Sequence, residues 1–179
     1  MTIDATVGGS SSNSYITVEE ADAYFLTCYN KPLWSGTSSN NKEIVLIEST
    51  RLLDTLVRWN GYLKSDTQAL KWPRTYVPTP DALYDWAESS LESYISDSII
   101  PKDVKNAVCE LAYSLLVNGG FISSENELSK VKVGPIDIDF SDTVKTNGLP
   151  IIVRDMISKL GSYSNTSSNS VHFSKLVRV

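Results

Sequence analysis

The segment Ile99–Leu115, IIPKDVKNAVCELAYSL, has the strongest helical pattern in the chain. Its apolar residues recur three or four positions apart, at Val104, Val108, Leu111, Ala112 and Leu115. That period places them on one face of an α-helix, so the segment predicts a central core helix. Pro101 stands near its start, where a missing amide N–H costs least. Asn118-Gly119-Gly120 is typical of a helix end.

Three further segments show the same period. Thr17 and Glu20 form a capping-box pattern ahead of a helix that continues to about residue 28. A second helix is predicted from about residue 42 to residue 59. Pro150 opens a last helix that runs to about residue 160. Residues 80–95 also have some helical character, so the sequence predicts a small bundle of about four or five helices.

Residues 129–140 change from the helical period to a period of two. Apolar side chains alternate with charged ones at Val131, Val133, Ile136, Ile138 and Phe140. This alternation predicts two strands, and Gly134-Pro135 predicts the turn between them. Because an isolated hairpin is marginal in water, we expect it to pack on the helices or to pair with strands of a neighbouring subunit. The expected fold class is mainly α, with this β-hairpin and extended terminal arms.

The chain divides by composition into three parts. Residues 1–14, MTIDATVGGSSSNS, predict a flexible N-terminal arm, and residues 15–160 predict the helical domain with its hairpin. Residues 161–179 predict a Ser/Asn-rich linker and a C-terminal docking tail. The tail residues expected to dock are His172, Phe173, Leu176, Val177, Arg178 and Val179. They either add to a partner as a strand or fold back on their own domain.

The composition bounds the classes of function. The chain has 179 residues, of which 41% are hydrophobic and 21% charged, which suits one folded domain. Its net charge of −5 gives no global basic field for DNA. No apolar run approaches the length of a membrane span, and no N-terminal targeting pattern is present. We therefore expect a protein made in the cytoplasm, with no membrane partner.

The side chains that carry most enzyme chemistry are scarce. His172 is the single histidine, and Cys28 and Cys109 read as buried thiols rather than as a metal site. Asp137 and Asp139 could hold a divalent ion, but a solvated strand face is the favoured interpretation. We predict no catalytic, cofactor or metal site, and therefore not an enzyme.

The stretch Ala69–Thr75, ALKWPRT, interrupts the helical pattern. We interpret Trp72 as an anchor in the core or a subunit seam, and Pro73 as the residue that fixes the exit direction. Arg74 then reaches a carboxylate, a helix end or an adjacent copy, and its removal should leave the monomer folded. A competing hypothesis is a single-stranded-DNA groove, in which aromatic rings stack on bases and cations contact phosphates. Its residues would be Trp59, Tyr62, Trp72 and Tyr76 with Lys64, Lys71 and Arg74.

Five motifs in fixed order resemble one phage family. They are NSYITVEEADAY (13–24), ESTRLLD (48–54), QALKWPRT (68–75), IPKDVKNAVCELA (100–112) and VKVGPI (131–136). This order resembles the small head–tail adaptor, or connector, proteins of tailed phages, a family that also carries the label DnaT-like single-stranded-DNA-binding protein. An acidic insertion at residues 80–98 departs from the shorter members.

The resemblance implies a structural virion protein at the head–tail junction, present in the host cytoplasm during assembly. It implies a ring of usually about twelve copies under the portal, which joins the capsid vertex to the tail and lets the double-stranded genome pass without sequence-specific binding. Its implied partners are the portal protein, tail or nozzle proteins and neighbouring copies. The portal would engage the C-terminal tail, and Trp72, Pro73 and Arg74 would be a structural signature. The alternative is a single-stranded-DNA-binding module that acts in phage replication.

Overall fold

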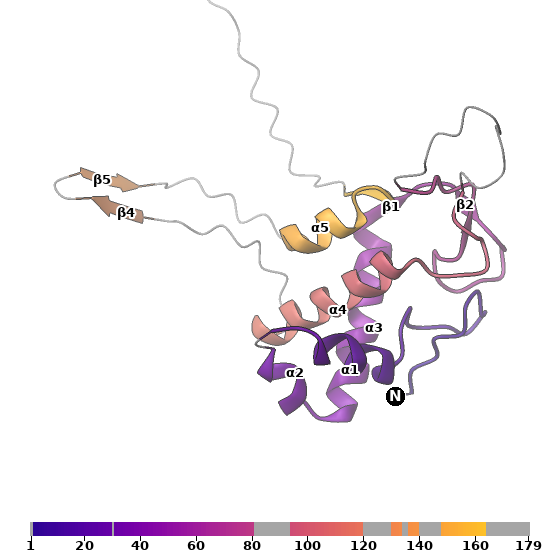
Figure 1. Ribbon diagram of the computed structural model, residues 1–179, viewed down its shortest axis with the longest axis horizontal. Helices are drawn as coiled ribbons and strands as arrows, with labels where there is room; N and C mark the ends of the chain where they lie inside the picture. The colour runs from indigo at the N-terminus through magenta and orange to yellow at the C-terminus, as the bar shows by residue number, and fades with distance from the viewer. Residues whose placement is uncertain are drawn as a thin grey trace, which may run out of the picture.

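The computed structural model describes residues 2–29, 31–80, 94–119, 130–133, 136–139 and 148–163. Helix α4 (Lys102–Val117) is central, because it packs against α3 (Ser39–Leu56) and α5 (Ile151–Ile157) and also contacts α1 (Val18–Leu26) and α2 (Pro32–Gly36) (Figure 1). The described part is therefore mainly helical, as the sequence predicts. The predicted inner face of α4 is confirmed. Its buried residues include Val104, Val108, Leu111, Ala112 and Leu115.

Helices α1, α4 and α5 begin where the sequence indicates, whereas α3 begins at Ser39, about three residues before the expected start near residue 42. Thr17 caps α1 through a complete capping box with Glu20, and Pro101 and Pro150 stand at the N-caps of α4 and α5. Opposite α4, helix α3 buries Leu46 and Leu53 completely. Burying a leucine side chain contributes about 1.5–3 kcal/mol each time, so the α3–α4 contact is a main source of stability.

Three short antiparallel strand pairs accompany the helices. Strand β1 (Val57–Trp59) pairs with β6 (Gly161–Tyr163), and β2 (Tyr62–Leu63) pairs with β3 (Arg74–Thr75). The third pair is the predicted hairpin, in which β4 (Lys130–Val133) runs against β5 (Ile136–Asp139). Figure 1 shows this hairpin apart from the helices. Phe140 lies outside the described residues, and pairing between subunits stays a prediction.

Several boundaries differ from the sequence expectation. The second helix ends at Leu56 instead of residue 59, because Val57–Trp59 leaves the helix to pair with β6. The first residues of the expected linker form that partner strand, Gly161–Tyr163. Helix α2 was not predicted, since five residues are too few to show a period. The acidic segment at 81–93 lies outside the described residues.

The N-terminal arm makes hydrogen bonds in this structure. Asp4 N–H donates to Asn13 Oδ1 at 2.8 Å, and Asn13 N–H donates back to the Asp4 carbonyl at 2.9 Å. Gly9 accepts a bond of 3.0 Å from Ala69 N–H, which ties the arm to the stretch before Trp72. The sequence of this arm has few side chains that could be buried, which predicts mobility, and that mobility stays a prediction. Across the described ranges, no helix has the length and apolar character needed to cross a membrane.

Candidate functional site

The corner around Trp72 is a buried, hydrogen-bonded junction. Tyr15 Oη donates to Asp54 Oδ1 at 2.5 Å, and Trp59 Nε1 donates to the same oxygen at 3.2 Å. Lys71 N–H donates to Asp54 Oδ2 at 3.0 Å, and Trp72 N–H donates to Tyr15 Oη at 3.2 Å. Burial raises the pKa of Tyr15, and the neighbouring Asp54 adds to the shift. Burial also raises the pKa of Asp54, although its three hydrogen bonds act against it.

Trp72 is the anchor that the sequence predicts. It is 1% exposed, and its ring meets that of Trp59 edge-on with centroids 5.7 Å apart. The Trp72-Pro73 peptide bond is cis, and Pro73 is also buried. Such a buried aromatic pair stabilises the corner beyond the area it removes from water. Trp59 and Trp72 are therefore placed to hold the fold and not to contact a ligand.

Arg74 is buried against the main chain. Its guanidinium donates to the carbonyls of Asn60 at 2.6 Å, Lys71 at 3.1 Å and Gly61 at 2.7 Å. Gly61 has a φ of +68°, and a Cβ there would lie 2.2 Å from the Thr75 carbonyl oxygen, so only glycine fits this turn. Arg74 was expected to reach a carboxylate, a helix end or an adjacent copy, but the turn instead brings three main-chain carbonyls around it.

The predicted DNA-contact cluster is divided by the fold. Trp59, Trp72 and Arg74 are buried and cannot stack on bases or reach phosphates. Tyr62 and Tyr76 are exposed, by 71% and 66%, and their rings meet edge-on with centroids 6.4 Å apart.

Tyr94 completes this exposed aromatic group. It is 50% exposed, and its ring centroid lies 5.7 Å from that of Tyr76. Two backbone contacts hold Tyr94 next to this segment. Tyr94 forms an isolated β-bridge with Pro78, and Ile95 N–H donates to the Val77 carbonyl at 2.9 Å. Sequence reasoning missed Tyr94, because it lies 18 positions after Tyr76 and no local pattern joins them. We call Tyr62, Tyr76 and Tyr94 the tyrosine surface.

Tyr76 has an unusual backbone conformation. Its φ is +57°, the only positive value among the non-glycine residues that the structure describes. A bulky side chain in the left-handed region is strained by about 1–3 kcal/mol, and such residues cluster at functional sites. The strain holds the Tyr76 ring in solvent between Tyr62 and Tyr94. This conformation makes the tyrosine surface a better candidate site than scattered exposed rings.

A small cavity lies just past the end of strand β2. Its volume is about 380 Å³, and its wall includes Lys64, two residues after Tyr62. The rest of the wall comes from Val7, Gly8, Ser65, Gln68, Pro73 and Ser98. Lys64 Nζ lies 3.3 Å from Asp97 Oδ1, with both side chains nearly half exposed. Lys71 is also exposed, and its ammonium donates to the Asp54 carbonyl.

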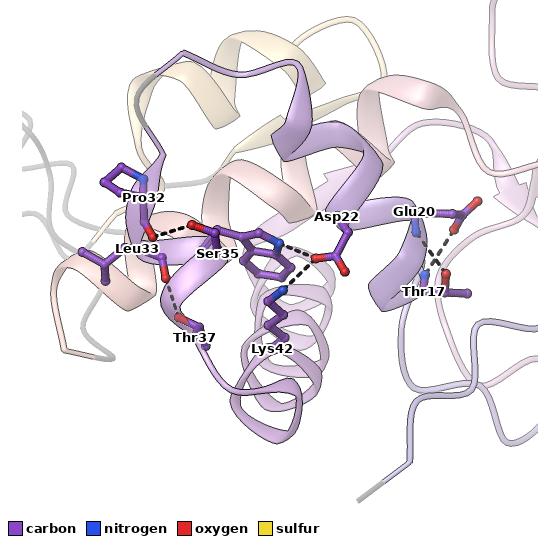
Figure 2. Close-up of polar contacts among 9 residues, drawn as sticks. Thr17, Glu20, Asp22, Pro32, Leu33, Ser35, Thr37 and Lys42 are labelled. Carbon is purple, nitrogen blue, oxygen red and sulfur yellow. Dashed lines mark hydrogen bonds and ion pairs between the residues drawn. The ribbon is translucent and has the colours of Figure 1, made fainter.

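A larger hollow of about 680 Å³ lies between α1 and α2. Asp22 accepts a hydrogen bond of 2.8 Å from Lys42 Nζ (Figure 2) and one of 2.7 Å from the Trp34 indole. Lys31 forms an ion pair of 2.9 Å with the buried Glu110. The charged groups around this hollow are therefore paired with one another and hold α2 in place.

The other predicted residues are placed as follows. The tail His172–Val179 lies outside the described residues, and the hairpin carries Val131, Val133, Ile136 and Ile138 in its strands.

The Cys109 thiol is a poor nucleophile. Burial is the largest cause that raises its pKa to about 12, and the negative charge of the nearby Glu110 raises it further. Within the parts that the structure describes, no group of acidic, histidine or cysteine residues could hold a metal ion.

A family model described as "Putative DnaT-like ssDNA binding protein" matches residues 1–179. No curated protein and no solved structure matches the chain.

Proposed function

Because the chain belongs to the DnaT-like single-stranded-DNA-binding family, we propose that it binds single-stranded DNA through the tyrosine surface. The observation that carries this proposal is the contact of three exposed rings, Tyr62, Tyr76 and Tyr94. Every base has a flat π-face, so aromatic rings bind single strands with little sequence preference. The role is one of binding, and it needs no cofactor.

The charge of the molecule sets the expected strength of binding. The net charge is −5, and the predicted DNA-contact cluster keeps two exposed cations, Lys64 and Lys71. A single strand gives a log–log salt slope of about −0.7 for each phosphate neutralised. Two lysines therefore predict a slope of about −1.4, with stacking supplying most of the affinity.

Fluorescence anisotropy with a labelled oligothymidine tests the proposal. Stacking on an aromatic ring contributes about 1–3 kcal/mol per base, so Tyr62→Ala with Tyr94→Ala should weaken binding at least tenfold. Tyr29→Ala is the matched control, because Tyr29 is 96% exposed and belongs to the α1–α2 connection. Absence of salt-dependent binding at micromolar protein, or equal binding by the double variant, would overturn the proposal.

A second candidate function is the head–tail adaptor of a phage virion. Two observations favour it besides the motif order: the hairpin stands apart from the helices in Figure 1, and the net charge is negative. Strands of adjacent copies could pair through β4 and β5 and so cover their edges. A channel that lets the genome slide needs few tight phosphate contacts. The partners would be neighbouring copies in a ring, the portal and tail proteins.

Electron microscopy and native mass measurement separate the two candidates. A ring of many copies on portal particles supports the adaptor, whereas a monomer that binds oligonucleotide supports the first proposal. Deleting residues 171–179 should abolish co-purification with the portal while leaving the helices folded. Unchanged portal binding by the deleted chain would remove the docking role of that tail.

A further inference from the structure

We propose that the cavity beside Lys64 is a phosphate subsite at the end of the tyrosine surface, and that Asp97 competes with the phosphate for Lys64. The inference deepens the proposed single-stranded-DNA binding and rests on it. It assigns a ligand class, a phosphate group, to a cavity of about 380 Å³.

Two segments of the chain lead from the tyrosine surface to the wall of the cavity. Lys64 N–H donates to the Pro73 carbonyl at 3.4 Å, which continues the β2–β3 pairing past Leu63. Lys64 lies two residues after Tyr62, at a bend that follows the end of β2. On the neighbouring segment, Asp97 lies three residues after Tyr94 and contacts Lys64. A strand stacked on the tyrosines would therefore bring its backbone to Lys64.

The polar groups of the cavity suit a phosphate. Lys64 supplies an ammonium, and Ser65 and Ser98 supply hydroxyls. Ser65 Oγ pairs with Thr67 Oγ1 at 2.8 Å, and Ser98 Oγ pairs with Ser96 Oγ at 2.8 Å. Each pair of hydroxyls uses one proton for its internal bond and keeps the other to donate. When Thr67 and Ser96 donate within their pairs, Ser65 and Ser98 can turn their O–H groups to the acceptor oxygens of a phosphate, and Lys64 adds an ammonium.

The ion pair between Asp97 and Lys64 is weak. The two charges make a single contact of 3.3 Å, and their side chains are 42% and 47% exposed. An exposed ion pair of this kind contributes little to stability, so a phosphate can displace the carboxylate at small cost. The same carboxylate repels a phosphate that approaches Lys64. Asp97 is therefore expected to weaken binding, and removing its charge should strengthen it.

Oligothymidine binding over a series of salt concentrations tests this arrangement. Lys64→Gln should reduce the magnitude of the log–log salt slope by about 0.7. Asp97→Asn should tighten binding by roughly twofold to fivefold, and the gain should vanish when Lys64→Gln is also present. Asp66→Asn is the matched control, because Asp66 is exposed two residues from Lys64 and has no recorded partner in the described part of the chain. Its gain should be smaller.

Terminal phosphates identify which phosphate the subsite takes. If oligonucleotides with and without a 5′- or 3′-phosphate bind equally, the ligand is a backbone phosphate. If a terminal phosphate tightens binding only when Lys64 is present, the ligand is the strand end. Either result supports the subsite when Lys64→Gln also lowers the magnitude of the salt slope. An unchanged salt slope in Lys64→Gln, or equal gains from Asp97→Asn and Asp66→Asn, would overturn it while leaving tyrosine-dependent binding in place.

A titration with inorganic pyrophosphate examines the cavity without DNA. The backbone amide resonances of Ser65, Gln68 and Ser98 should shift in the unmodified chain and stay fixed in Lys64→Gln. Pyrophosphate shifts without oligonucleotide binding would keep the subsite and remove the proposed function. Absence of both signals in the unmodified chain would overturn both.

Discussion

Trp72 is buried to 1% exposure, yet its indole N–H has no hydrogen-bond partner in the described part of the structure. Trp72→Ala should lower the free energy of unfolding by about 3–5 kcal/mol, because it leaves a large cavity next to Trp59. Trp72→Phe should cost clearly less, since it keeps most of the ring contact and removes an unpaired donor. Urea unfolding followed by circular dichroism measures both. Equal losses for the two variants would show that the indole nitrogen matters more than the packing.

Arg74 leads to a different prediction from the one that its sequence context suggests. Arg74→Ala should lower the free energy of unfolding by about 3 kcal/mol, because it leaves three carbonyls without a charged donor. Arg74→Lys should recover only part of this loss, since an ammonium lacks the planar fork of donors. Thermal and urea unfolding measure the series. An alanine variant within about 0.5 kcal/mol of the parent would contradict this account.

The contrast between these two residues shows what local sequence can reveal. Trp72 was predictable as an anchor, because a tryptophan before a proline suits a packed corner. The role of Arg74 was not predictable, since its partners Asn60 and Gly61 arrive through the β2–β3 pairing. Tyr94 was missed for the same reason, as a contact across the segment from 81 to 93. Local pattern identifies side chains that pack, and distant contacts decide which ones stay exposed.

At the scale of single elements, the start of α1 depends on Glu20. Burial alone would raise the pKa of Glu20, but hydrogen bonds from Lys105 and the Thr17 N–H lower it below the ordinary 4.5. A lowered folded-state pKa means that the stabilisation is present above pH 4.5 and is lost as the pH falls through the folded-state value. Glu20→Gln should therefore cost about 0.5–1 kcal/mol at pH 7.

The measurement is urea unfolding of the Glu20→Gln variant between pH 3 and pH 7. The cost should disappear toward low pH, because the parent then carries a protonated Glu20 as well. Glu19→Gln is the control, since Glu19 is exposed in the same turn and makes no recorded side-chain contact among the described residues. A cost that stays constant with pH would mean that the hydrogen bonds to Glu20 do not depend on its charge.

The elements differ in how well their sequences predict them. Helices α1, α3, α4 and α5 were predictable, because each has a cap or proline at its start and an apolar face of period 3.6. Helix α2 and strand β6 were not. Trp34 holds α2 by packing against Phe25, with centroids 4.5 Å apart, and β6 exists only because β1 lies beside it. Short elements depend on tertiary contacts that a local period does not contain.

At the scale of the whole molecule, the two candidate functions use different surfaces. The tyrosine surface belongs to the β2–β3 region and the segment beginning at Tyr94. The hairpin β4–β5 lies elsewhere and stands apart from the helices in Figure 1. A chain that binds single strands as a monomer does not need the hairpin. A chain that assembles into a ring through strand pairing does.

Replacing residues 129–140 by a Gly/Ser segment of equal length tests this division directly. The midpoint of thermal unfolding should change by less than about 2 °C, because the core lies among α1, α3, α4 and α5. Oligothymidine binding should also persist, since Tyr62, Tyr76 and Tyr94 remain. Native mass measurement on portal particles should show loss of any ring. A clearly lower midpoint of thermal unfolding would show that the hairpin contributes to the core. A ring that still assembles would exclude strand pairing as the interface between copies.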